Sequence, residues 1–223
     1  MLFRSLARPF ISGKECYPFA VTSGDMLAKA AESGFDPGRS AFFMPSGTGP
    51  CRFGQYNLAQ RLVLDAAGYP DVPIFAPVQS ERLYRDLGLV SRDFPGRSWV
   101  GVVAFDLLTK CLHERRPRAK DPAEAEAAYG RAVERLRAAL LERDAEAGAA
   151  RVLAEAREDF AGVAQNGSPR PRIGIVGEIF VRSNRFSNED LVARIEALGG
   201  EAWLSPIDEW IYYVNEMSLR QAR

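Results

Sequence analysis

The residues best suited to chemistry are a cysteine and an arginine within the segment Ala41–Tyr56 (AFFMPSGTGPCRFGQY). The apolar run at its start predicts a buried strand, and the two glycines that follow predict a tight loop. Because proline suits the first position of a helix, Pro50 predicts that Cys51 and Arg52 lie in a first helical turn. The positive end of that helix and the Arg52 guanidinium would stabilise a thiolate, which is the form that binds metal or attacks an electrophile.

The glycines around Cys51 predict room for a bound group close to the backbone. The candidate cofactor-binding set here is Gly47, Gly49, Arg52, Gly54 and Gln55. A glycine loop before a helix is also a common anion site, so a phosphate or a CoA fragment without any metal is an alternative ligand. The plainer alternatives are a tight turn for the glycines and a surface salt bridge for Arg52.

The three cysteines of the 223-residue chain do not suggest a disulfide framework. Cys16 lies in the turn-like stretch Gly13–Pro18, far from Cys51 in sequence, and could equally be a small buried apolar residue. Cys111 falls inside a helical pattern and is predicted to be structural. His113, the only histidine, precedes a run of charges and is predicted to be a solvated helix residue.

The charge balance argues against two classes of partner. Lys+Arg and Asp+Glu both number 29, so no net positive charge favours nucleic acid or an anionic membrane. No apolar run approaches the roughly 20 residues that span a bilayer, and the start lacks the core of a signal peptide. These features predict a cytoplasmic protein. Because Lys14–Cys16 comes so early and no convincing strand precedes it, we expect a fragment or one module of a longer polypeptide or assembly.

The first part of the chain, residues 1–95, is predicted to be a cysteine-bearing α/β unit. A helix over 23–33 precedes a strand over 41–44, and a strand over 71–77 follows the cysteine-bearing helix. That helix is expected to bury Leu58, Leu62 and Ala66. Helices alternating with strands are typical of a layered domain with a mainly parallel sheet, in which ligands bind at the carboxyl ends of strands.

The middle part, residues 96–168, is predicted to be a helical layer. A helical pattern covers 99–112, and Asp121 is a capping residue for an amphipathic helix that reaches Arg143. A second such helix covers 149–163. This inserted helical pair carries no recognisable chemistry and is expected to pack against the sheet or against a partner.

The last part, residues 169–223, is predicted to be a second βαβ unit, alone or integrated with the helical layer. Strands over 172–177 and 201–204 flank a helix that buries Leu191, Ile195 and Leu198. Glu178 and Arg182 follow the first strand, where they either face a ligand crevice or pair with each other. The predicted fold class is therefore α/β, with two Rossmann-like βα units, mainly parallel sheets and an inserted helical pair.

Four stretches together carry a family resemblance. Gly49–Tyr56 (GPCRFGQY) resembles the acyl-CoA dehydratase activase-related family, whose members are similar to the D-component of 2-hydroxyacyl-CoA dehydratases. Ser12–Cys16, Gly177–Arg182 with Phe186–Asn188, and Ser205–Ile211 agree with the same family. Their order and spacing cover nearly the whole chain.

The resemblance implies two Rossmann-like units that hold an oxygen-sensitive iron–sulfur cluster, expected to be of the 4Fe–4S type. In the related dehydratases an ATP-driven activator donates one electron to that cluster, which enables radical dehydration of a 2-hydroxyacyl-CoA. Cys16 and Cys51 match the family's cysteine positions and would be metal ligands by this carry-over. Cubane clusters usually take four cysteines, so the remaining ligands would come from a second subunit, a missing segment or an external group.

The leading functional prediction is an iron–sulfur component for one-electron transfer in CoA-thioester metabolism, acting as an oligomer or in a larger complex with an ATP-dependent activator. The chain has no phosphate loop of the G-x-x-x-x-G-K type, so it would be the electron-accepting part of a dehydratase system. One alternative is a phosphate- or CoA-binding α/β module without a cluster. Another is a subunit that acts only by docking through its Ala/Glu/Arg-rich helices.

Overall fold

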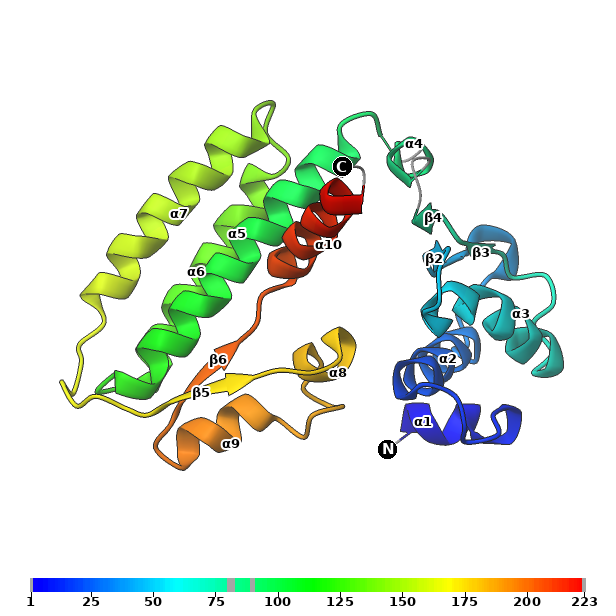
Figure 1. The fold of residues 1–223 in the computed structure, drawn as a ribbon, viewed down its shortest axis with the longest axis horizontal. Helices are drawn as coiled ribbons and strands as arrows, with labels where there is room; N and C mark the ends of the chain where they lie inside the picture. The colour runs from blue at the N-terminus through cyan, green and yellow to red at the C-terminus, as the bar shows by residue number, and fades with distance from the viewer. Residues whose placement is uncertain (1, 80–82, 89–90, 222–223) are drawn as a thin grey trace. The chain divides into compact units, whose positions relative to one another are not determined.

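The computed structural model describes residues 2–79, 83–88 and 91–221, which form two compact units, Met1–Arg92 and Asp93–Arg223. Helices dominate both units, and every strand pair named in the described part is parallel (Figure 1). The mixed α/β class is thereby confirmed. Each described sheet holds only two strands, so the Rossmann-like character of the units stays a prediction. None of the described helices has the length and apolar character that crossing a membrane requires.

The first unit folds around two helices and two short parallel pairs. Strand β1 pairs with β3, and β2 pairs with β4. In each pair, the chain between the first and the second strand crosses over through α3. Phe19, Leu27 and Leu64 lie in the buried core between the helices. Its elements are α1 (Leu2–Ala7), η1 (Arg8–Phe10), α2 (Tyr17–Ala30), η2 (Pro37–Arg39), β1 (Phe42–Phe43), β2 (Ser46–Gly47), η3 (Arg52–Gln55), α3 (Tyr56–Ala66), β3 (Ile74–Phe75), β4 (Val78–Gln79) and α4 (Leu83–Leu87).

The buried face of α3 differs from the predicted one. Leu58 and Leu62 were expected inside but are 59% and 70% exposed. The face that packs on the core instead includes Gln60 and Leu64, which are almost completely buried. Gln60 can be buried because its Nε2 donates a hydrogen bond to Thr22 Oγ1 at 3.0 Å. A pattern that treats glutamine as a surface residue therefore selects the wrong face.

The second unit is built on three long helices that lie side by side (Figure 1). Helix α6 begins where its side-chain cap was expected, since Asp121 accepts from the Ala123 N–H at 2.9 Å. Helix α7 begins at Ala145, earlier than the predicted range of 149–163, because Asp144 caps it by accepting from the Ala147 N–H at 3.0 Å. The elements are α5 (Phe94–Arg115), η4 (Arg116–Arg118), α6 (Pro122–Ala139), α7 (Ala145–Gly162), β5 (Arg172–Ile175), α8 (Ile179–Ser183), α9 (Leu191–Ala197), β6 (Glu201–Leu204) and α10 (Ile207–Gln221).

The β5–β6 pair and its crossover helix form the predicted βαβ arrangement. Arg172 aligns with Glu201 and Ile175 with Leu204 in parallel register. Helix α9 lies on one side of the pair and α5 on the other (Figure 1). Leu198, expected to be buried, is 90% exposed, because α9 ends at Ala197 and the chain turns away there.

A buried carboxylate fastens β6 to its neighbours. Glu201 is 1% exposed and forms ion pairs with Arg118, from η4, and with Arg172 Nε at 3.0 Å from the adjacent strand. An ionised carboxylate inside a protein must be paired, since its desolvation is otherwise too costly. The pairs therefore join the sheet to the segment that follows α5.

We predict that Leu108→Ala lowers the free energy of unfolding of the second unit by about 3 kcal/mol, because Leu108 is 1% exposed in the helical core. Leu107→Ala is the matched control: its side chain is 44% exposed, and a loss within about 0.5 kcal/mol is expected. Urea titration followed by tryptophan fluorescence measures this, since all three tryptophans lie in the second unit. Equal losses in the two variants would contradict the packing described here.

Candidate functional site

Cys51 is an exposed residue just beyond the carboxyl end of β2. Its backbone is extended (φ −73°, ψ 126°), and it is the N-cap residue of η3, whose Gly54 N–H donates to the Cys51 carbonyl at 3.2 Å. Helix α3 begins only at Tyr56, so the prediction that Cys51 and Arg52 lie in its first turn was wrong. Cys51 precedes a single 3-10 turn instead, and Arg52 is the first residue of that turn.

Cys16 is likewise a helix N-cap residue. It is half-buried against the core of the first unit and precedes α2, which begins at Tyr17 although Pro18 follows. The helix tolerates that proline because the N–H groups of a first turn have no helical partner. Cys16 is thus held at the junction between a surface turn and the core.

The turn before Cys16 is fixed by one carboxylate. Glu15 accepts hydrogen bonds from the Ser12 N–H, the Ser12 hydroxyl and the Gly13 N–H, all at 2.9 Å. These bonds favour the ionised form and lower the pKa of Glu15 to about 2. The turn therefore keeps its shape across the physiological pH range.

Arg52 connects the two cysteine-bearing segments. Its Nη1 donates to the Lys14 carbonyl at 3.0 Å, across 38 residues of sequence. Lys14 lies two residues before Cys16, and Arg52 directly follows Cys51. The described residues contain no group of three or more His, Cys, Asp or Glu side chains arranged to hold a metal.

The glycines of the loop bring its own backbone together. A Cβ on Gly54 would lie 2.4 Å from the Gly47 carbonyl oxygen, and the Ser46 hydroxyl donates to the Gly54 carbonyl at 2.8 Å. Gly49 is exposed and has a left-handed φ of 123°, whereas Gln55 is an exposed residue at the start of α3. Gly47 and Gly54 therefore have a structural use that does not require a ligand.

Glu178 and Arg182 belong to the second unit, whereas Cys16 and Cys51 belong to the first. Glu178 caps α8 by accepting from the Val181 N–H at 2.8 Å, and Arg182 Nη1 donates to the Gly177 carbonyl at 3.0 Å. The described structure has no ion pair between Glu178 and Arg182. Arg182 Nε is buried and has no hydrogen-bond partner among the described residues.

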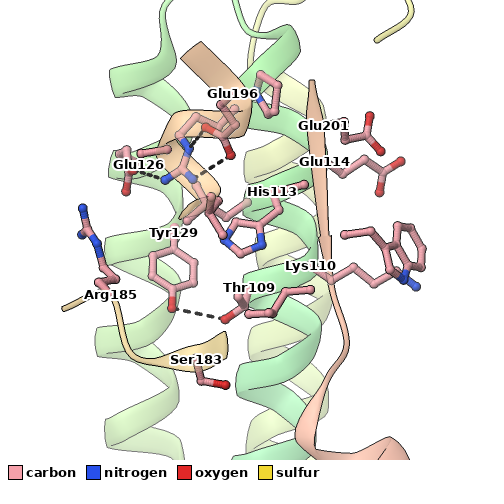
Figure 2. A pocket seen from close by; sticks show the side chains of 18 of the residues that line it. Thr109, Lys110, His113, Glu114, Glu126, Tyr129, Ser183, Arg185, Glu196 and Glu201 are labelled. Atoms are coloured by element: carbon pink, nitrogen blue, oxygen red, sulfur yellow. Dashed lines mark hydrogen bonds and ion pairs between the residues drawn. The ribbon is translucent and has the colours of Figure 1, made fainter. Parts of the chain in front are cut away.

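Arg182, for which the sequence left open a place at a ligand crevice, lines a cleft of about 920 Å³, whereas Glu178 is not among the described residues of its lining. Its walls are α5, the start of α6, the α8–α9 connection, and the end of β6 with the residues after it. Figure 2 shows Thr109 and His113 on α5 facing Tyr129 on α6. The only sequence signal for this cleft is that several motif residues follow the carboxyl ends of two parallel strands.

His113 is half-buried in this cleft and is not the solvated residue that was predicted. Burial, followed by the nearby Arg116 charge, lowers the pKa of His113 to about 4. Arg116 turns inward because it pairs with Glu196 at 2.7 Å and also with Glu126 (Figure 2). Glu126 and Glu196 both lie outside the run of charges that follows His113, so that run could not indicate these ion pairs.

Cys111 packs against the helical core of the second unit, in agreement with the structural role predicted for it. Burial raises the pKa of its thiol, which disfavours the reactive thiolate. Cys111 is therefore the control cysteine with which the reactivity of the two cysteines of the first unit can be compared.

Comparison with protein-family models, with curated proteins and with solved structures finds no match to this chain. The family resemblance therefore depends on the sequence motifs alone.

We predict that Gly54→Ala disrupts the Cys51 loop, because the added methyl would collide with the Gly47 carbonyl oxygen. Hydrogen exchange followed by mass spectrometry should show faster exchange in peptides that cover η3 and the start of α3. Gly34→Ala is the control in the same unit, since its Cβ would meet nothing within 4 Å. Unchanged exchange in the Gly54 variant would show that the contact is not required.

We predict that the second unit loses stability as the pH falls from about 6.5 to 4, because folding holds His113 neutral below its ordinary pKa. The depressed pKa means that the unfolded chain binds the extra proton in this window, which costs up to about 3 kcal/mol. His113→Gln should reduce this pH dependence, as measured by urea titrations at several pH values. Asp106 and other groups titrate in both proteins, so they do not affect the comparison. If the variant shows the same dependence of stability on pH, His113 is not the source of that dependence.

Proposed function

We propose that the chain is an iron–sulfur-binding component related to 2-hydroxyacyl-CoA dehydratases and their activators, and that it takes part in one-electron transfer in CoA-thioester metabolism. The observation that carries this proposal is the hydrogen bond from Arg52 Nη1 to the Lys14 carbonyl. It links the two segments whose motifs contain Cys16 and Cys51. Two cysteine motifs distant in sequence thus become neighbours in the fold.

The donor set fits part of a cluster site. Cys16 and Cys51 would provide two thiolate ligands, and a cubane cluster usually takes four. The exposure of Cys51 leaves it accessible to ligands from outside the chain. We therefore propose that a second subunit, a further segment or an external group completes the site, within an oligomer or a complex that includes an ATP-dependent activator.

The residues around the two thiols would prepare them for metal. When bound, the cluster would supply the capacity to accept and donate single electrons. Arg52 donates to the Lys14 carbonyl and so holds the segment of Cys51 against that of Cys16. Glu15 holds the turn that positions Cys16. Free thiols and an oxygen-sensitive group fit the reducing cytoplasm, which is the location we propose.

A second candidate function uses the same loop without a cluster. Gly49 is exposed, its added Cβ would meet nothing within 4 Å, and Arg52 beside it is also exposed. This arrangement suits a phosphate or CoA phosphate group held by the loop. Binding of such a ligand that is unaffected by Cys51→Ser, in protein that takes up no iron, would favour this candidate.

We predict that anaerobic reconstitution with iron and sulfide gives the wild-type protein a cluster absorption band. Cys51→Ser and Cys16→Ser should each lose most of the bound iron, because each removes one of the two thiolate ligands. Cys111→Ser is the matched control and should retain iron, since its thiol lies in the helical core of the other unit. Iron-free wild-type protein, or equal loss in all three variants, would contradict the proposal.

A further inference from the structure

The cleft in the second unit has more uncommitted positive than negative side chains. Most of its carboxylates are already engaged: Asp190 pairs with Arg185, Glu126 and Glu196 pair with Arg116, Glu201 pairs with Arg118 and Arg172, and Asp106 accepts the N–H groups of Ile207 and Asp208. Among the described lining residues, Glu114 and Glu209 are the acids without such a partner. The cations without a carboxylate partner are Lys110, Lys120, Arg170 and Arg182.

Arg182 is the cation whose hydrogen-bonding capacity is most clearly unused. Its Nη1 donates to the Gly177 carbonyl, while its Nε is buried without a partner among the described residues. A buried guanidinium N–H without an acceptor is costly, so such a group points to a ligand or an ordered water. Guanidinium groups bind carboxylate and phosphate oxygens especially well.

The other walls of the cleft suit an organic molecule. Lys110 Nζ and Arg172 Cζ each lie 4.5 Å from the ring centroid of Trp203, so this aromatic ring holds two positive charges in place. At neutral pH His113 adds no charge to the cleft, because its pKa is about 4. The volume of about 920 Å³ lies within the usual range for small-molecule sites. The cleft runs along β6 and continues past its carboxyl end to residues 205–207, and it is at this end of a parallel sheet that ligands bind.

We propose that this cleft binds a small organic anion with two or more negative charges, carried by phosphate or carboxylate groups, and that Arg182 and Lys110 bind those groups. This site is separate in residues and in chemistry from the proposed cluster site. Its ligand would be held by charge-assisted hydrogen bonds from the two cations.

Isothermal titration calorimetry of the whole chain at low salt tests the proposal, with ADP, inorganic phosphate and citrate as probes. ADP and citrate distinguish phosphate from carboxylate recognition, and inorganic phosphate tests whether an organic body is needed. We expect at least one of the two organic probes to bind. Lys110→Gln and Arg182→Gln should each weaken that binding about tenfold or more, because each removes a charge-assisted contact.

Arg194→Gln is the matched control, since this exposed arginine of the same unit pairs with Glu189 and does not line the cleft. It should change the dissociation constant less than about twofold. If Arg182→Gln fails to fold, Lys110→Gln decides the outcome alone. Cys51→Ser should bind as the wild type does, which separates this result from that of the cluster. Absence of binding by both organic probes, or binding unaffected by Lys110→Gln, would overturn the proposal.

Discussion

The parallel strand pairs of this protein are too narrow to be stable without the helices around them. Each described sheet has two strands, and a parallel pair needs a crossover segment that covers one of its faces. Helix α3 has this role in the first unit, and α9 has it in the second. The segments after β2 and β5 are therefore held by helices on either side; Cys51 lies in the first of these segments, and Arg182 lies in α8 within the second.

The two units use polar side chains in different ways. In the first, Glu15 and Arg52 bind backbone groups, so they set the path of the chain and leave an exposed thiol. In the second, Arg116 and Glu201 pair with other side chains and join η4 to the βαβ region. Because ion pairs engage Glu126, Asp190, Glu196 and Glu201, more cations than acids are left without an ion pair among the described residues of the cleft.

The sequence predicted those parts of the fold that depend on local signals. The cap of α6 and the strand 201–204 follow from local residue types and agree with the structure. The failures involve contacts between distant residues. Gln60 is buried with a hydrogen bond to Thr22, and His113 lies half-buried near Arg116, which pairs with Glu196. No periodicity along α3 or α5 contains that information.

The candidate site was predictable in its residue types but not in its grouping. Two of the four motif stretches, Ser12–Cys16 and Gly49–Tyr56, meet through the Arg52–Lys14 hydrogen bond. The other two supply Arg182, Asn188 and Ser205 to the same cleft. The sequence alone suggests one ligand crevice shared by all four stretches. In the fold, two of the stretches belong to the first unit and two belong to the second. Thiols recognise metal and guanidinium groups recognise anions, so under the two proposals each pair of stretches would have its own ligand chemistry.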